Sequence, residues 1–199
     1  MMYRYWLSGG TFLVVALVCS AQSQPESKKG KEMLKPRNDL PGLTNFAQVS
    51  PILFRGAQPT EPGFKTLQKM GVKTIVNLRW LHSDRAMLKG LGLQYVHIEC
   101  QAWNPNDTEV AQFIQVLRNS KNHPVFVHCQ HGADRTGMMV AVYRIMEQDW
   151  GPAEAGKEIH QFGFHKVWTE IADYLKKFDR QKFNEQVKKT KEPRVELVN

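Results

Sequence analysis

Residues 125–137 read VFVHCQHGADRTG, a hydrophobic segment that runs into a short polar turn and then into a helical pattern. A turn at the N-terminus of a helix presents several backbone N–H groups, and the helix dipole adds positive potential there. Gly132 gives this turn access to positive φ and lets the backbone come close to a ligand. The stretch therefore predicts a loop that binds an anion, and a doubly charged phosphate ester fits it.

Two side chains of the loop are suited to phosphate chemistry. The N–H groups that bind an anion also favour a thiolate, so we expect the pKa of Cys129 to fall from about 8.5 into the range of roughly 3.5 to 7.5. Cys129 is therefore predicted to be a nucleophile, and the alternative is a buried, inert thiol at the end of a core strand. Arg135 is placed to hold two phosphate oxygens with its planar fork.

The rest of the loop is predicted to bind the substrate. Thr136 can hydrogen-bond the sulfur and ease its departure as a thiolate. His131 is expected to face solvent or substrate, either as a charge that favours additional phosphate groups or as a plain exposed histidine. His128 is interpreted as a packed imidazole that steadies the loop. The full predicted substrate-binding set is Gln130, His131, Gly132, Ala133 and Thr136.

The pattern around the loop predicts the fold class. Short β-branched runs predict strands, and apolar residues at three-and-four spacing predict helices. The strands are expected at 72–78, 95–98 and 124–128, and the helices at 107–118, 136–148, 153–160 and 167–178. Thr108 or Asp107 is expected to cap the first of these helices. Strands that alternate with helices favour an α/β fold, with a central, mostly parallel sheet flanked by helices.

The two ends differ in composition from the middle of the chain. Residues 1–21 carry one cation and an apolar run that is short for a membrane span, followed by small residues. This is typical of a signal peptide, here cut after Ala21, so we expect an exported protein, periplasmic or secreted. An uncleaved anchor or lipidation at Cys19 are the alternatives. We expect a flexible leader at 22–42, a single folded domain at 43–180 and a charged C-terminal tail at 181–199.

Charge and cysteine content limit the partners. The 199-residue chain has a formal net charge of +8, which favours polyanionic partners such as phosphate esters. The Lys-rich C-terminal segment is interpreted as solvated surface, so no nucleic-acid partner is expected. No Cys or His motif with zinc spacing occurs, and we expect no metal and no cofactor. Cys100 is either a resolving partner for an oxidised Cys129 or a small apolar filler.

The loop pattern H-C-x5-R-T, between a strand and a helix, resembles the signature of the cysteine-dependent protein tyrosine phosphatase superfamily. The segments LFRGAQP at 53–59 and GVKTIVNLR at 71–79 are similar to the N-terminal half of small atypical dual-specificity phosphatases. The resemblance covers residues 43–180. It implies a dual-specificity-phosphatase-like domain, a two-step reaction through a phosphocysteine, independence from metal ions, and substrates that include phosphotyrosine.

The resemblance also implies an acid that protonates the leaving group, and two residues compete for this role. Asp107 lies 22 residues before Cys129, which is nearer than the usual acid of the superfamily, and it could instead cap a helix. Asp134 belongs to a D-R-T-G sequence similar to that of myotubularin-type and some secreted bacterial lipid phosphatases, in which this aspartate is proposed as the acid. It could instead pair with a basic neighbour. We rank Asp134 ahead of Asp107.

Three functions are consistent with these patterns. The first is an exported phosphatase of dual-specificity type, acting on a phosphorylated protein. The second acts on phosphoinositides or inositol polyphosphates, and the third binds phosphate without turnover. Membrane contact is expected only through an uncleaved or lipidated N-terminus. Trp103 is expected to close a corner of the core rather than stack on a substrate, and Arg55 and Arg79 either widen the positive field or form surface ion pairs.

Overall fold

A six-stranded mixed sheet organises the fold. The computed structural model describes residues 31–199, so the predicted signal peptide and residues 22–30 of the leader lie outside the described residues. The strands are β1 (Ala47–Ser50), β2 (Leu53–Gly56), β3 (Thr74–Asn77), β4 (Gln94–His97), β5 (Val125–His128) and β6 (Glu196–Leu197). Their order is β1-β2-β5-β3-β4-β6, in which β2, β5, β3 and β4 are parallel and the two edge strands are antiparallel. The predicted, mostly parallel sheet is confirmed.

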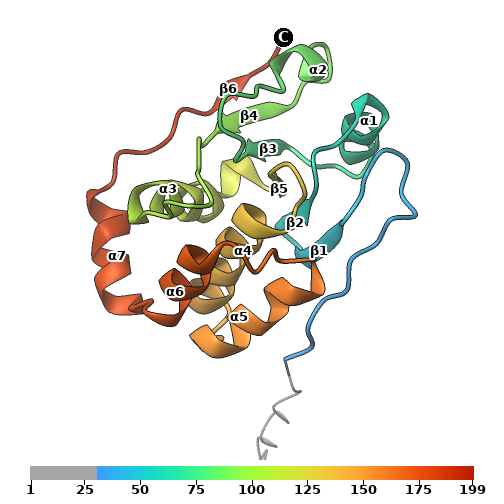
Figure 1. Ribbon diagram of the computed structural model, residues 1–199. Coiled ribbons are helices and arrows are strands. Elements are labelled where there is room, and N and C mark those ends of the chain that lie inside the picture. The colour runs from blue at the N-terminus through green and yellow to red at the C-terminus, as the bar shows by residue number, and fades with distance from the viewer. Residues whose placement is uncertain (1–30) are drawn as a thin grey trace, which may run out of the picture. The chain divides into compact units, whose positions relative to one another are not determined.

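Helices cover both faces of the sheet (Figure 1). They are α1 (Glu61–Lys69), α2 (Arg85–Leu88), α3 (Asp107–Arg118), α4 (Asp134–Glu147), α5 (Pro152–Gln161), α6 (Thr169–Lys176) and α7 (Arg180–Lys189). Helices α1 and α2 pack on one face, and α3 to α7 pack on the other. The predicted α/β architecture with helices on both faces is therefore confirmed.

Strand β5 shows how the sequence separates the two cores. Side chains alternate between the faces of a strand. Phe126 packs with Phe64 of α1 in one core, whereas Val125 and Val127 pack in the other core with α3 and α4. All four residues of β5 are buried. A central strand that is covered on both faces reads as a continuous apolar run, which is why this segment was recognisable in the sequence.

Helix α3 matches its predicted bounds, but its cap differs. The side chain of Asn106 accepts hydrogen bonds from the backbone N–H groups of Thr108 at 3.0 Å and Glu109 at 3.3 Å. The expectation that Asp107 or Thr108 caps the helix was therefore wrong, by one residue or by two. A capping side chain must sit just outside the helix, where its backbone is extended and its oxygen can reach the orphan N–H groups.

The C-terminal residues are part of the domain, in contrast to the expected charged tail at 181–199. Helix α7 buries Phe183 and Val187 in the same core as α3. Strand β6 then pairs antiparallel with β4. The lysines of α7 occupy its exposed face. Because the segment is so highly charged, the helical spacing of its two apolar residues, Phe183 and Val187, was not recognised in the sequence.

The domain also begins before the expected start at Leu43. Arg37 and Phe46 form an antiparallel bridge, and the backbone N–H of Leu34 donates to Glu158 of α5 at 3.0 Å. Residues 33–42 of the predicted leader therefore contact the folded domain. Within residues 31–199, the helices are all too short or too polar to cross a lipid bilayer.

Candidate active site

The loop after β5 lies at the carboxyl edge of the parallel strands. Ligands bind at this edge in open α/β sheets. Because β5 lies between β2 and β3, its loop is joined to the segments that follow both neighbours. The N–H of Gln58 donates to the carbonyl of Gln130 at 3.2 Å, and the N–H of Leu78 donates to the carbonyl of His128 at 2.9 Å. The sheet thus holds the loop between two neighbouring turns.

The loop presents a run of unpaired backbone donors. Within residues 31–199, the N–H groups of residues 130–136 donate to no protein acceptor, and the first such bond of the turn runs from Gly137 to the carbonyl of Ala133. Several of these groups belong to the first turn of α4, where orphan N–H groups and the helix dipole favour an anion. The backbone of this loop therefore has the donors that an anion needs, and Gln130, His131, Gly132, Ala133 and Thr136 all lie in it. That these residues bind the substrate stays a prediction.

Gly132 is required by two separate constraints. Its φ is +70°, a conformation that costs side-chain-bearing residues free energy. A Cβ atom at this position would also lie 2.5 Å from the backbone N of Ala57 and 2.5 Å from the carbonyl group of Gly56. The loop can approach the turn after β2 this closely only because residue 132 has no side chain.

Cys129 lies at the base of the loop, directly after β5, with 1% of its surface exposed. Its thiol is free, as is that of Cys100, so no disulfide joins them in this structure. Burial raises the pKa of Cys100 to about 12, which disfavours the thiolate that a resolving cysteine needs. The hydroxyl of Thr136 is buried without a hydrogen-bond partner, and its predicted contact with the sulfur stays a prediction.

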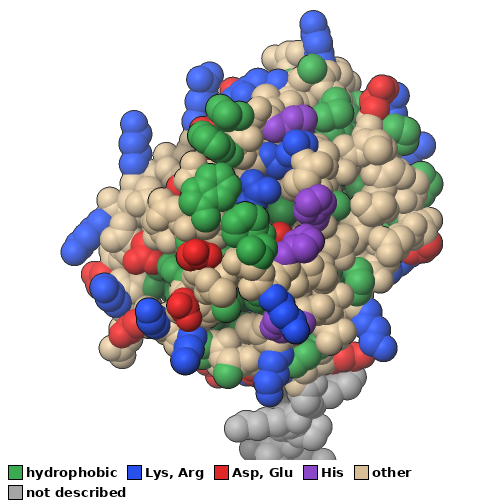
Figure 2. All heavy atoms as spheres, viewed as in Figure 1, with side chains coloured by type: hydrophobic (Ala, Val, Ile, Leu, Met, Phe, Trp, Pro, Cys, Tyr) green, Lys and Arg blue, Asp and Glu red, His purple; other side chains and the backbone are tan. Residues whose placement is uncertain are grey.

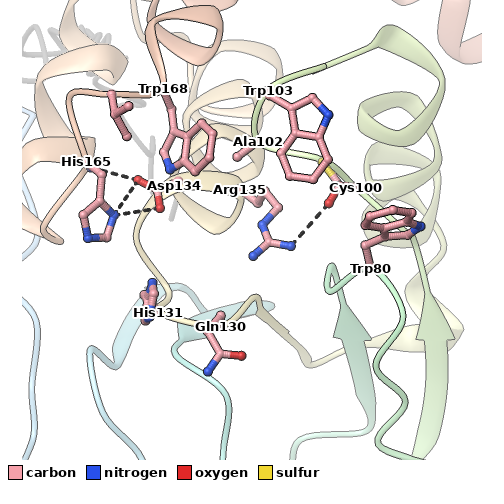
Figure 3. A pocket seen from close by; sticks show the side chains of 11 residues that line it. Trp80, Cys100, Ala102, Trp103, Gln130, His131, Asp134, Arg135, His165 and Trp168 are labelled. Carbon is pink, nitrogen blue, oxygen red and sulfur yellow. Dashed lines mark hydrogen bonds and ion pairs between the residues drawn. The ribbon is translucent and has the colours of Figure 1, made fainter.

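Arg135 lines a pocket of ≈ 420 Å³ at the mouth of the loop. Its Nη1 lies 3.3 Å from the carbonyl oxygen of Cys100 and 3.4 Å from that of Leu78, and its Nε is buried without an acceptor. Figure 2 shows hydrophobic side chains beside histidine and Lys or Arg side chains on this face. In the close view, the guanidinium points into the middle of the pocket (Figure 3). Arg135 therefore keeps donors that are free to bind an anion.

Three tryptophans form the apolar wall of this pocket. The ring centroids of Trp80 and Trp103 are 6.0 Å apart, and those of Trp103 and Trp168 are 6.2 Å apart. Trp103 is 51% exposed, so the expectation that it closes a corner of the core was wrong. The ring instead packs edge-on against the exposed ring of Trp80 and at a tilt against the half-buried ring of Trp168.

Arg55 supports the loop from below. It is fully buried in β2, and its Nη2 donates to the carbonyl of Gly132 at 2.6 Å while its guanidinium lies 3.6 Å above the ring of Phe162. Burial lowers the pKa of Arg55 to about 10, against the opposing charges of Glu158 and Cys129. It stays positive at neutral pH, beneath the loop. Sequence reasoning offered a surface ion pair as one alternative for Arg55, and that alternative was wrong.

A second network steadies the start of the loop. His128 donates from Nε2 to Asp84 at 2.8 Å, and Gln58 donates to the other oxygen of Asp84 at 2.8 Å. Arg79 in turn donates to Gln58 at 2.8 Å. Burial acts to raise the pKa of Asp84, but the hydrogen bonds and charges, led by His128, outweigh it and leave this pKa below its usual value. Burial lowers the pKa of Arg79.

The two predicted acids lie in different places. Asp134 lines the main pocket and is 6% exposed, and its carboxylate accepts from the backbone N–H and the Nδ1 of His165 at 2.8 and 2.9 Å. Asp107 lies outside this pocket and accepts from the hydroxyl of Tyr174 at 2.8 Å. The structure therefore brings only Asp134 of these two into the pocket that Arg135 lines, and its role as proton donor stays a prediction.

His165 is a pocket residue that sequence reasoning missed. It follows α5 and reaches the pocket through the connection to α6, far along the chain from the loop. Within the described residues, the donor atoms of His131, Asp134 and His165 are close enough together to hold a metal ion. His131 and Asp134 lie three residues apart, but His165 lies 31 residues after Asp134. No short sequence motif therefore contains all three residues.

Several phosphatases are similar to this chain in sequence or in fold. The chain is 35% identical over 121 residues to the dual specificity protein phosphatase TpbA of Pseudomonas aeruginosa (strain UCBPP-PA14), a match that covers 60% of this chain and 55% of TpbA. The chain thus spans about half the length of this relative. It is 27% identical over 173 residues to inositol diphosphatase DSP4 of Arabidopsis thaliana, covering 83% of this chain and 84% of DSP4.

A crystal structure of P. aeruginosa TpbA matches with a TM-score of 0.68 and 28% identity, over 77% of this chain and 96% of that chain. A further TpbA structure of the same TM-score is a complex with pTyr. The family model described as DSP-PTPase phosphatase fused to NAD+ kinase matches residues 43–177, which include Cys129 and Arg135. Since this match extends over more than half of the sequence, the chain belongs to this DSP-PTPase family.

Proposed function

We propose that the chain is a cysteine-dependent phosphatase that hydrolyses phosphate monoesters through a phosphocysteine at Cys129. The observation that carries this proposal is the run of unpaired N–H groups at residues 130–136, directly after Cys129 and with Arg135 among them. Such donors suit the three equatorial oxygens of a transferring phosphoryl group. Membership of the DSP-PTPase family supports the proposal.

The reaction has two steps on this geometry. The sulfur of Cys129 attacks phosphorus, so that the S–P bond forms while the bond from phosphorus to the leaving oxygen breaks, and the carboxyl group of Asp134 gives that oxygen its proton. The loop N–H groups and Arg135 stabilise the negative charge of the transition state. Water then attacks the phosphocysteine and gives a proton to the carboxylate of Asp134, the S–P bond breaks, and inorganic phosphate and the thiolate are released.

We propose phosphotyrosine in a protein as the preferred substrate. The wall formed by Trp80, Trp103 and Trp168 offers edge and face contacts to a phenyl ring, and a hydroxyl-rich ring gains less from such a surface. The name of TpbA as a dual specificity protein phosphatase and its complex with pTyr support this choice.

Inositol phosphates are the second candidate. The specific observation is that His131 and His165 line the pocket beside Arg135, which provides additional groups for a substrate with more than one phosphate. The name of the relative DSP4, an inositol diphosphatase, supports this alternative.

One assay tests all three functions. The purified protein is given a phosphotyrosine peptide and an inositol polyphosphate, with Cys129→Ser as the control. We expect turnover of both esters to be lost in Cys129→Ser and kcat/KM to be higher for the peptide. A higher value for the inositol ester would favour the second candidate. Phosphate binding by the wild type without any turnover would leave only a binding module.

We further propose that residues 1–21 direct export. The support is the sequence, with its apolar run and the small residues around Ala21. Mass spectrometry of the protein from its own cells tests this. We expect a mature N-terminus at Gln22 in the exported fraction. An intact N-terminus in the membrane fraction would instead indicate that the segment is an uncleaved anchor.

A further inference from the structure

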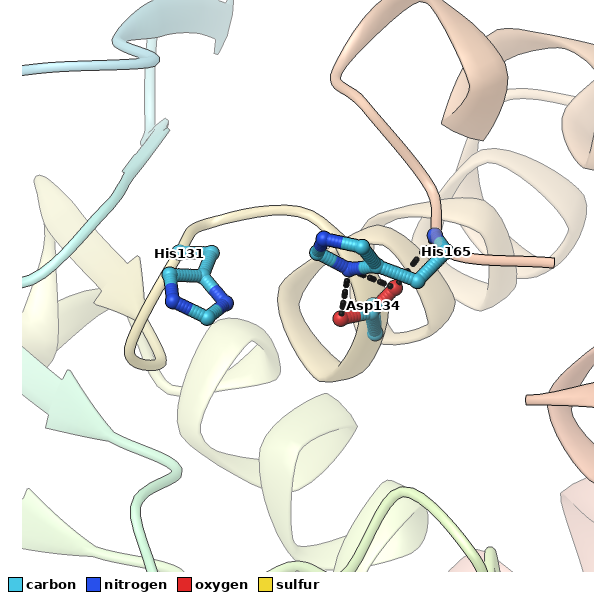
Figure 4. A group of neighbouring side chains, drawn as sticks. All are labelled: His131, Asp134 and His165. Carbon is cyan, nitrogen blue, oxygen red and sulfur yellow. Dashed lines mark hydrogen bonds and ion pairs between the residues drawn. The ribbon is translucent and has the colours of Figure 1, made fainter. Parts of the chain in front are cut away.

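Three side chains on one wall of the pocket are arranged as metal ligands. His131 lies in the phosphate loop, Asp134 begins α4, and His165 lies in the connection between α5 and α6. One donor atom of each lies within 4.8 Å of the other two. Figure 4 shows the two imidazole rings next to each other with the carboxylate beside the His165 ring. We propose that these residues form a binding site for a divalent transition metal ion of the zinc type.

The donor set selects the class of ion. Two imidazole nitrogens and one carboxylate oxygen are ligands that zinc and its neighbours in the first transition row prefer. Magnesium and calcium favour oxygen ligands throughout, so they fit this set poorly. Sequence motifs gave no sign of the site, because its ligands come from two segments that are distant in the chain.

The spacing of Asp134 and His165 already suits coordination. Their nearest atoms, Oδ2 and Nδ1, are 2.9 Å apart. Two ligand atoms of a tetrahedral zinc ion, each about 2.0 to 2.1 Å from the metal, lie roughly 3.3 Å apart. Without an ion, this close contact is held by a proton between the two atoms. A metal ion takes the place of that proton, because ligand atoms must be deprotonated to bind.

The backbone segments that carry the ligands are held together before an ion binds. The other oxygen of Asp134 accepts the backbone N–H of His165 at 2.8 Å. The side chain of Asn45 donates to the carbonyl of His131 and to the carbonyl of Phe162, both at 2.9 Å. Asn45 thus joins the loop that carries one histidine to the segment that leads to the other. Such outer contacts favour metal binding because they keep the segments that carry the ligands close together.

A filled site would regulate the same pocket. All three ligands line the pocket that Arg135 and Gln130 also line, and three protein ligands leave an open position on a tetrahedral ion. The ion therefore stands where the substrate enters, and we expect it to inhibit turnover, a consequence that rests on the proposed phosphatase function. The charge of Arg135 opposes a cation here, so the ion is expected to be removable by a chelator.

The test uses Co²⁺ as a visible substitute for zinc. The purified full chain without a polyhistidine tag is titrated with Co²⁺ in a phosphate-free buffer, and the absorption bands of tetrahedral Co²⁺ are followed. We expect these bands in the wild type and an apparent affinity at least about 100-fold lower in His131→Asn and in His165→Asn. The matched control is His160→Asn, an exposed histidine of α5 outside this pocket, which keeps the bands.

Cys129→Ser separates this site from metal binding by the nucleophile. The proposal expects the bands to persist in Cys129→Ser. It is overturned if the wild type shows no tetrahedral bands, if both histidine variants keep them, or if they are lost in Cys129→Ser together with a sulfur-to-cobalt charge-transfer band. Circular dichroism verifies the folding of each variant. The absorption measurement needs no turnover, so it tests the metal site even if the phosphatase proposal fails. The regulatory consequence is tested separately, by inhibition of turnover with Zn²⁺ and its recovery after a chelator is added.

Discussion

Arg135 makes few contacts with the protein, and this determines what its replacement should do. Its Nη1 reaches two backbone carbonyls at long range, and its Nε has no acceptor. We therefore predict that Arg135→Lys folds normally but lowers kcat by about 10²- to 10³-fold, because a lysine cannot hold two phosphate oxygens at once. Steady-state kinetics on an aryl phosphate measures this. Arg118→Lys, on the exposed face of α3, is the control, and a loss of equal size there would contradict the assignment.

Arg55 separates stability from activity. Its Nε and Nη1 are buried without partners, so Arg55→Met removes two unpaired donors and costs one hydrogen bond to Gly132. We predict a change in unfolding free energy within about 1.5 kcal/mol, because these effects offset each other. The loop loses its support, so kcat/KM should fall by roughly 10- to 100-fold.

Urea unfolding and kinetics on the same Arg55→Met preparation provide the comparison. Glu158 does not become an isolated charge in this variant, since Arg144 donates to it at 2.8 Å. A large loss of stability with unchanged kcat/KM would mean that Arg55 holds the fold rather than the loop.

Asp107 provides a test of the acid that the structure places outside the pocket. Its carboxylate accepts from Tyr174, and an asparagine can accept the same bond. We predict that Asp107→Asn leaves the ratio of kcat/KM for an alkyl phosphate to that for p-nitrophenyl phosphate unchanged. A true acid contributes about 10²- to 10⁴-fold, mostly for the poor leaving group. If kcat/KM fell selectively for the alkyl phosphate, Asp107 would be identified as the proton donor.

Single residues differ in how far the sequence reveals them. Cys129, Gly132 and Arg135 lie within one short segment, so their spacing alone brought them together, and the structure places them in one loop. Arg55 and His165 act on this loop from distant segments. No local pattern connects them to it, because the contact depends on how β2 and the segment after α5 pack around β5.

Elements were predictable where their pattern is long. Helix α3 shows four apolar residues at regular spacing and was found with its bounds, and β5 is a continuous apolar run. The short strand β2 includes a buried arginine and a glycine, and β6 has only two residues. Strands of this kind form because a neighbour provides hydrogen bonds, and their own sequence gives no period to detect.

The packing of helix α7 leads to a prediction about stability that would not follow if residues 181–199 were a charged tail. Phe183 is 2% exposed, and its ring centroid lies 4.9 Å from that of Phe178. We predict that Phe183→Ala lowers the unfolding free energy by about 3 kcal/mol, since it leaves a cavity in the core. The exposed Lys189→Ala is the control and should change it by less than about 0.5 kcal/mol. If both variants changed the unfolding free energy by the same small amount in urea, α7 would not contribute to the core.

At the scale of the whole molecule, the parallel sheet explains why the site could be located from the sequence before its walls were known. Three neighbouring strands end at the same edge, so the residues that follow β2, β5 and β3 must meet there. The loop after β5 was identified by its own motif. The tryptophan wall comes from three separate connections, and only the assembled fold brings these rings together.

The response of the whole molecule to acid should depend on Asp84, which links three of these connections. Its pKa is lowered in the folded protein, below the value of about 3.9 expected when unfolded. The ionised carboxylate therefore contributes stability that is present above about pH 4 and is lost as the pH falls through the folded pKa. We predict that Asp84→Asn costs about 3 kcal/mol at pH 7, because the single acceptor oxygen of asparagine cannot replace both carboxylate oxygens, which accept from His128 and Gln58. Urea unfolding from pH 7 to pH 2 should show this difference shrinking only below about pH 4, and a difference that stayed constant to pH 2 would mean that the charge of Asp84 contributes nothing.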